Sequence, residues 1–133
     1  MKKVNIIVGV LVVVLVVIFS SVSNRTEPKP AYNAASEMRV HGTIQEVEEF
    51  FCPVTEDRGV HLHLKTASGI IMVHVGIGRV LRSNNIRFSV GDQVEVLGSK
   101  IKYQGADSVI AREITRGDDI FILRDQNGNP RLN

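Results

Sequence analysis

Hydrophobic and polar residues alternate along residues 60–65, and hydrophobic residues recur at every second position from 71 to 75. A period of two is typical of a β-strand that has one buried face and one face open to solvent. The alternation is interrupted at residues 66–69, where small and polar side chains favour a turn. The pattern therefore predicts an antiparallel hairpin, whose hydrophobic face is formed by Val60, Leu62, Leu64, Ile71, Val73 and Val75.

A two-residue loop at residues 67–68 fixes the register of this hairpin. It pairs Leu64 with Ile71, and the next hydrophobic residues along each strand also meet. Hydrophobic residues then face only hydrophobic residues, so the register is consistent with one buried face. The same register gathers three histidines on the open face, with the first and the last directly opposed: His61, His63 and His74.

Further segments with strand character lie on both sides of the hairpin. Residues 38–51 predict a long first strand, whose hydrophobic face shifts between Ile44 and Val47. A bulge or a bend is the usual cause of such a shift, and Gly42 inside the strand is typical of one. Residues 76–85 predict a turn and a short helix. Later strands are predicted at residues 93–103, 106–115 and 120–124.

The order of these elements indicates the fold class. In an OB-fold barrel, three strands are followed by a short helix and two further strands. Residues 38–133 contain no longer helical period, which disfavours an α/β architecture. We therefore expect an all-β domain over residues 38–133: a five-stranded OB-fold-like barrel with a short helix after its third strand. Residues 118–133 are expected to add a strand and a tail.

The N-terminal segment has another pattern, because residues 4–19 are almost wholly aliphatic. A helix extended to Val22 has about 19 residues, which at about 1.5 Å per residue just spans a hydrocarbon core near 30 Å. Lys2 and Lys3 precede it, so we expect a cytoplasmic N-terminus and a domain in the periplasm or an equivalent lumen. A cleaved signal peptide is the alternative. The length of the run favours a single-pass transmembrane anchor at residues 1–22, followed by a linker at 23–37.

The net charge of +2 raises the question of nucleic-acid binding. Four of the 16 basic residues and one of the 14 acidic residues precede position 31, which leaves 12 basic and 13 acidic residues in the remainder. The predicted domain is thus nearly neutral. A general attraction to phosphate backbones is not indicated.

Several short segments together resemble a group of small bacterial exported domains with an OB-fold-like architecture. They are GVHLHLKT (59–66), VHVG (73–76), VGDQVEVLGS (90–99), AREI (111–114) and LRDQNGNP (123–130). In layout the chain is also similar to the magnetosome protein S family, membrane proteins linked to magnetite crystal growth. This resemblance implies a magnetosome membrane location and a part in iron mineralisation. The chain departs from the group at Gly76-Ile77, where Gly-Pro is frequent, and at Leu132-Asn133, where an aromatic residue is frequent.

The open face of the hairpin carries the clearest candidate chemistry. Opposed side chains in an antiparallel pair lie about 5 Å apart and diagonal ones about 7–8 Å apart, so His61, His63 and His74 can converge. Imidazole binds iron, copper and zinc, and water or Glu49 could complete such a site. The alternative is an exposed strand face on which the histidines are merely polar. The three histidines are therefore the candidate ligands of a transition metal.

The hairpin and the short helix also offer a contact surface for a ligand or a partner, formed by Lys65, Met72, Arg79 and Arg82. OB-folds often bind single-stranded nucleic acid on their second and third strands, through stacked aromatic residues and basic grooves. The second and third predicted strands contain no Trp, Tyr or Phe. A partner protein is therefore favoured over a nucleic acid.

Catalysis is not indicated. The clustered carboxylates of Glu46, Glu48 and Glu49 are typical of a solvated strand edge. Cys52 is the sole cysteine, so it cannot form an internal disulfide, and its role stays open. We expect a non-enzymatic, membrane-tethered binding module outside the cytoplasm, which assists magnetite crystal maturation by binding a metal or a partner protein. The alternative is an exported nucleic-acid-binding OB-fold domain.

Overall fold

The computed structural model describes residues 28–133. The predicted transmembrane anchor lies outside the described residues, and within them no helix has the length and hydropathy needed to cross a bilayer. The described part is an all-β domain. Its elements are, in chain order, the 3₁₀ helix η1 (Ala34–Ser36), β1 (Glu37–Cys52), β2 (Asp57–Thr66), β3 (Gly69–Ile77), the helix α2 (Gly78–Ser83), β4 (Gln93–Tyr103), β5 (Ala106–Arg116) and β6 (Asp119–Ile122).

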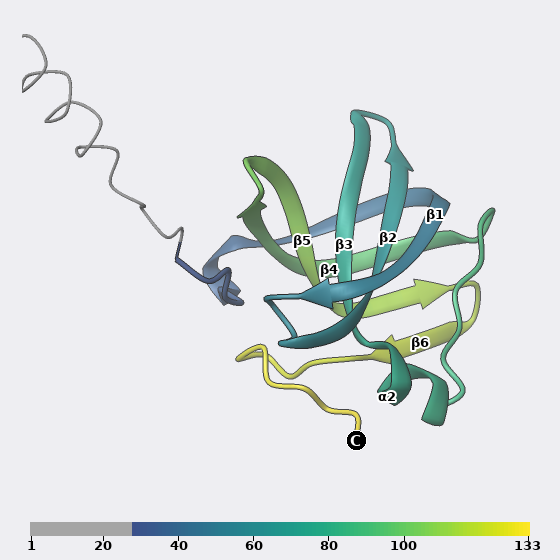
Figure 1. Ribbon diagram of the computed structural model, residues 1–133. Helices are drawn as coiled ribbons and strands as arrows, with labels where there is room; N and C mark the ends of the chain where they lie inside the picture. The colour runs from purple at the N-terminus through teal and green to yellow at the C-terminus, as the bar shows by residue number, and fades with distance from the viewer. Residues whose placement is uncertain (1–27) are drawn as a thin grey trace, which may run out of the picture.

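The strands form one sheet that closes on itself (Figure 1). Neighbouring strands follow the order β3-β2-β1-β4-β5-β6, and each of these pairs is antiparallel. A parallel pairing between residues 72–74 of β3 and 108–110 of β5 joins five strands into a ring. The predicted all-β class, the barrel-like ring and the short helix after the third strand are confirmed. β6 extends the edge of β5 and corresponds to the strand predicted after residue 118.

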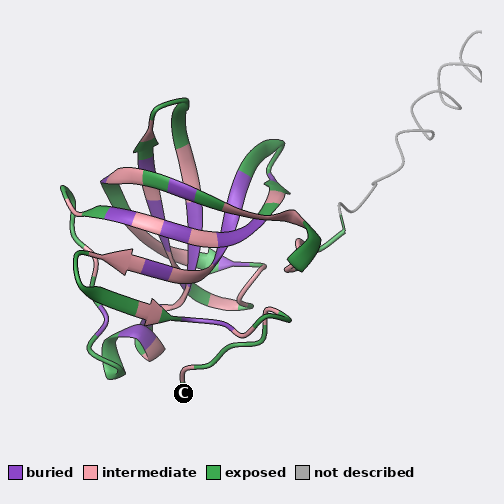
Figure 2. Cartoon of the chain, turned by 180° about the vertical axis from the view of Figure 1, so that it is seen from behind, coloured by how far each residue is buried: buried purple, intermediate pink, exposed green. Residues whose placement is uncertain are grey.

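The barrel core is built by hydrophobic residues on one face of each strand (Figure 2). Leu62, Leu64 and Val73 have no exposed surface, as the alternation in the hairpin predicts. Complete burial of such a side chain contributes roughly 1.5–3 kcal/mol, so this face stabilises the closed ring. The cluster is completed by Val40, Ile44, Val75, Leu81, Ile86, Val94, Val96, Val109, Ala111, Ile114 and Leu123.

Two irregularities bend the sheet, and the first lies where the sequence predicts one. The register of β1 against β2 shifts between Ile44 and Glu46, where the hydrophobic face changes sides. The register of β4 against β5 shifts at Gly98. A Cβ atom at Gly98 would collide with the carbonyl oxygen of Ile110. Only glycine therefore permits the close approach of these two strands.

The hairpin has the predicted register from the turn to His61, which pairs with His74, and the register then shifts so that Val60 pairs with Gly76 instead of Val75. Its second face is not open, however, because both of these histidines are completely buried. This corrects the expectation that they face solvent. The covering groups come from other strands: Phe50 stacks on His61, Cys52 contacts His74, and Tyr103 packs edge-on against His74. The domain thus has a second, smaller buried layer outside the barrel core.

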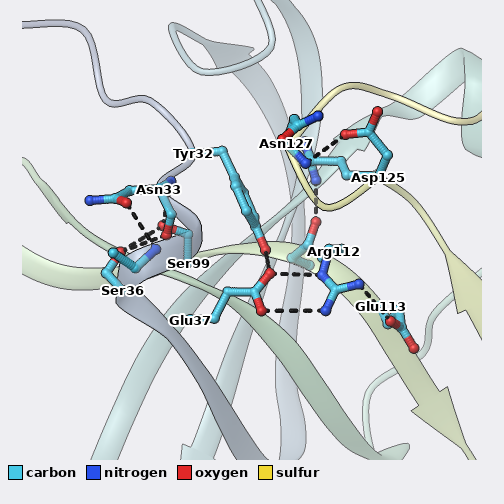
Figure 3. Close-up of polar contacts among 12 residues, drawn as sticks. Tyr32, Asn33, Ser36, Glu37, Ser99, Arg112, Glu113, Asp125 and Asn127 are labelled. Carbon is cyan, nitrogen blue, oxygen red and sulfur yellow. Dashed lines mark hydrogen bonds and ion pairs between the residues drawn. The ribbon is translucent and has the colours of Figure 1, made fainter.

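The residues just before β1, which fall in the predicted linker, are bound to the barrel (Figure 3). The backbone N–H of Asn33 donates to Ser99 Oγ at 3.0 Å, and the hydroxyl groups of Ser36 and Ser99 lie 2.9 Å apart. The Tyr32 hydroxyl donates to the carboxylate of Glu37. These contacts fix residues 32–37 against the side of the barrel.

Candidate metal centre

His74 of β3 is oriented by a chain of hydrogen bonds. Its Nε2 lies 2.8 Å from Ser108 Oγ, which lies 3.0 Å from the carbonyl oxygen of Met72. Since a carbonyl only accepts, the single hydroxyl proton of Ser108 is donated to Met72, and His74 Nε2–H donates to Ser108. The Nδ1 atom of His74 therefore carries a lone pair. Burial first, and then the neighbouring imidazole of His61 and the guanidinium of Arg124, lower the pKa of His74 to about 3, so the ring is neutral.

The lone pair of His74 faces a thiol. Cys52 is the last residue of β1 and has no exposed surface, and its Sγ lies 3.4 Å from His74 Nδ1. Gly59 on the neighbouring strand makes room for it, because a Cβ at that position would lie 3.1 Å from the Cβ of Cys52. Cys52 Sγ and His74 Nδ1 can share the thiol proton in a hydrogen bond, or they can bind one metal ion together.

His61 of β2 lies beside this pair. Its ring is stacked on Phe50 with centroids 4.0 Å apart, and the ring of His74 meets it edge-on at 4.8 Å. Both ring nitrogens are buried, and neither has a hydrogen-bond partner among residues 28–133. Burial lowers the pKa of His61, and the charge of Glu48 and then the backbone of Gly59 oppose this shift. Neither ring nitrogen forms a hydrogen bond with Gly59. The imidazole is therefore a buried polar group whose donor and acceptor are both unsatisfied.

The three side chains meet at a spacing suited to a metal ion. One ligand atom each of Cys52, His61 and His74 lies within 4.8 Å of the other two. Zinc–sulfur bonds near 2.3 Å and zinc–nitrogen bonds near 2.0–2.1 Å imply ligand separations of about 3.3–3.8 Å. The distance between Cys52 Sγ and His74 Nδ1 already falls in that range. Binding requires only a small inward movement of His61.

A buried cation and an aromatic ring lie close to the cluster. The buried guanidinium of Arg124 is close enough that the charge of Cys52 raises its pKa, although burial has the larger, opposite effect. Tyr103 closes the site on the side of His74, and its ring centroid lies 4.7 Å from that of His74. Burial, and then the charge of Cys52, raise the pKa of Tyr103. The cluster thus lies in a poorly solvated pocket with one cation nearby.

The structure does not bring His63 into this group. Its Nε2 lies 2.9 Å from Glu48 Oε2, and a half-exposed group of Glu46, Glu48 and His63 forms beside the strand. Glu49, considered as a fourth ligand, instead pairs with Arg82 at 2.6 Å. Two of the three predicted histidines are therefore brought together. Their third neighbour is Cys52, which the sequence analysis left without a role.

The predicted contact surface is divided between the hairpin and α2. Lys65 is exposed on β2, and Met72 is half-buried on β3. On α2, Arg79 pairs with Asp57 at 2.9 Å, and Arg82 pairs with Glu49. Because both arginines have carboxylate partners, their charges are largely neutralised. The helix therefore presents little net positive charge to a partner.

A comparison with protein families shows which family this chain belongs to. The model of the MamS/MamX magnetosome protein family matches residues 36–121, from the residue before β1 into β6. The chain belongs to the MamS/MamX magnetosome protein family. The resemblance inferred from the sequence is thereby confirmed. The MamS/MamX match includes all three residues of the buried cluster and ends before Arg124.

Other comparisons add little to the MamS/MamX assignment. No curated protein matches the sequence. Among solved structures, the N-terminal domain of PriB protein from Thermoanaerobacter tencongensis, described as dimeric, is similar with a TM-score of 0.46 and 16% sequence identity. That match covers 64% of this chain and 99% of the other. A likeness this remote carries no function from one protein to the other.

Proposed function

We propose that this MamS/MamX-family protein is a membrane-tethered, non-enzymatic binding module of the magnetosome. In this proposal, it holds one transition-metal ion at Cys52, His61 and His74, and it assists crystal maturation through that metal or through a partner protein. The family match supports the magnetosome association. The aliphatic run at residues 4–19 supports a tether that places the domain outside the cytoplasm.

One observation supports the metal site above all others: both nitrogens of His61 are buried without a partner. A buried polar group that makes no hydrogen bond destabilises a protein by about 1–3 kcal/mol. Such a group is rare in native structures and is often explained by a bound ion or a functional role. A metal bound between His61 and the Cys52–His74 pair would use the lone pair that is otherwise left unsatisfied.

The donor set favours zinc or copper over iron. Thiolate is a soft ligand that selects copper(I) and zinc, whereas imidazole accepts several metals. The common non-haem iron(II) site uses two histidines and one carboxylate. No carboxylate belongs to the Cys52–His61–His74 group as described within residues 28–133. A role in mineralisation would then involve a metal other than the one that forms the crystal.

Cobalt(II), zinc and copper(I) titrations of the full chain without a histidine tag, kept in detergent micelles, test the proposal. We expect one bound ion per chain and, with cobalt(II), a thiolate-to-metal absorption band. Cys52→Ser removes the band. His74→Ala weakens binding by more than about 100-fold, because losing a ligand exceeds the 10–100-fold effect of second-shell changes.

His63→Ala is the matched control, because it removes a neighbouring histidine that lies outside the cluster. We expect it to leave the affinity unchanged. Absence of stoichiometric binding, or equal binding by the wild type, Cys52→Ser and His74→Ala, would contradict the metal site. The domain would then be better described as a tethered protein-interaction module.

Ser108→Ala gives a smaller, graded effect. The serine orients His74 through its Nε2–H and leaves Nδ1 available to a metal. Loss of such an outer partner weakens metal binding by about 10-fold or somewhat more. Competition against a chromophoric chelator measures this change. An unchanged affinity would mean that the hydrogen bond does not hold the ring in its binding orientation.

A further inference from the structure

A cavity of about 310 Å³ lies between α2 and the segments at the two ends of the described chain, and its lining includes none of the three metal-centre residues. Its wall is largely hydrophobic and includes the side chains of Val54, Val75, Ile77, Val80, Leu81 and Leu123. The volume is at the lower end of the range of about 300–1,000 Å³ that is usual for small-molecule sites. Neither the barrel core nor the metal cluster accounts for this space.

The cavity contains one charged group that is nearly buried. Arg124 is only 7% exposed and lines the cavity wall. Its Nη1 donates to the carbonyl oxygens of Val75, at 2.9 Å, and Ala111. Burial lowers its pKa to about 10, so the guanidinium is still charged at neutral pH. The Nε and Nη2 groups donate to no acceptor among residues 28–133.

The charge of Arg124 is not neutralised by a carboxylate of residues 28–133. Its sequence neighbour Asp125 accepts hydrogen bonds from the backbone N–H groups of Asn127 and Asn129, and therefore caps the following turn. Lys29 on the cavity wall is paired with Glu56 at 2.6 Å. A buried charge without a counter-ion is unfavourable, so an anion that enters this cavity would be bound by a preformed cation.

We propose that this cavity binds a small amphipathic carboxylate, with its two oxygens on the Nε–Nη2 edge of Arg124 and its hydrocarbon part against the apolar wall. The planar guanidinium matches a carboxylate through two parallel hydrogen bonds. The apolar wall favours a short hydrocarbon chain over a purely polar acid such as acetate. This site uses none of the three side chains of the metal centre, although Arg124 lies near them.

The cavity walls are fixed by a polar network, so the site is preformed (Figure 3). Tyr32 packs against Gly128 of the C-terminal segment and donates to Glu37. The carboxylate of Glu37 accepts from Arg112 Nε at 2.8 Å and from Nη2 at 3.3 Å. The carbonyl oxygen of Arg112 in turn accepts from the backbone N–H of residues 123 and 124. Preformed walls lower the ordering cost of binding.

Calorimetric titration of the full chain in phosphatidylcholine nanodiscs with octanoate tests the site, with empty nanodiscs as the baseline. We expect one octanoate per chain. Octanol, which has the same chain length without the charge, binds at least about 10-fold more weakly. Arg124→Gln weakens octanoate binding by a similar factor, and Arg39→Gln, a surface arginine paired with Glu95, does not.

A second variant tests the cavity independently, in case Arg124→Gln does not fold. Val80→Trp fills the cavity from α2 and leaves Arg124 intact, and we expect it to weaken octanoate and octanol alike. Cys52→Ser keeps octanoate binding, which separates this proposal from the metal site. Absence of binding above the empty nanodiscs would overturn the proposal, as would equal binding of octanoate and octanol in the wild type. Octanoate binding unchanged in both Arg124→Gln and Val80→Trp would also overturn it.

Discussion

We expect the metal-free His61→Leu variant to be more stable than the metal-free wild type by about 2 kcal/mol, and to bind no metal. The substitution removes two buried nitrogens that lack hydrogen-bond partners, and each such group costs about 1–3 kcal/mol. Leucine is similar in size to histidine and can remain packed against Phe50. For a domain of this size, the gain corresponds to a melting temperature higher by about 10 °C.

We expect bound metal to make the wild type more stable than the His61→Leu variant, which reverses the order found without metal. A ligand at about 1,000 times its Kd stabilises the folded state by roughly 4 kcal/mol, and only the wild type can gain it. Thermal unfolding with a chelator and with excess zinc measures both differences. His63→Leu is the control, because its ring is half-exposed and bonded to Glu48, so neither the stability gain nor the loss of metal is expected. A metal-free His61→Leu protein that is less stable than the wild type would mean that His61 is a satisfied structural residue.

The second large effect is a loss of stability of the metal-free protein between pH 7 and pH 5. His74 has a folded-state pKa of about 3, against about 6.5 in the unfolded chain. Below pH 6.5, the unfolded chain therefore takes up a proton that the folded state does not. The stability is fully present above about pH 7 and falls as the pH decreases towards 3. His74 alone contributes a loss of about 2 kcal/mol between pH 7 and pH 5.

Burial lowers the pKa of His61 as well, and its contribution has the same sign. Carboxylates such as Glu37 and Glu49 have lowered pKa values through their partners Tyr32, Arg112 and Arg82. Their stabilisation is lost only as the pH falls below their ordinary value near 4.5, so the window from pH 7 to pH 5 isolates the histidines. Urea unfolding at pH 7, 6 and 5 measures the change, and His61→Leu is expected to make it smaller. Stability that stays constant over this window would show that both imidazoles are solvated in the folded protein.

The strands of the barrel could be predicted from the sequence because the alternation of hydrophobic and polar residues is a local property of each strand. The alternation at residues 60–75 determines the hairpin and its register, including the pairing of His61 with His74. The shift between Ile44 and Val47 indicates the irregularity in β1. These features depend on residues that are neighbours in the chain or across one turn. The pattern of hydrophobic residues along the sequence is therefore enough to predict them.

The candidate site could be predicted only in part, because its members meet through tertiary contacts. Alternation identifies two faces of a hairpin but not what covers the second face, which here is Phe50, Cys52 and Tyr103. Cys52 comes from the far end of a 16-residue strand. A buried arginine such as Arg124 has no periodic signature at all. The one available signal for the thiol was chemical, since a lone cysteine and two opposed histidines form a plausible ligand set.

X-ray absorption spectroscopy of the zinc- or copper-loaded full chain tests the metal centre most directly. We predict one sulfur ligand at about 2.3 Å and two imidazole nitrogens at about 2.0–2.1 Å, with the sulfur contribution absent in Cys52→Ser. A first shell that contains only nitrogen and oxygen in the wild type would contradict the site at Cys52, His61 and His74. Such a result would direct attention to the half-exposed group at Glu46, Glu48 and His63.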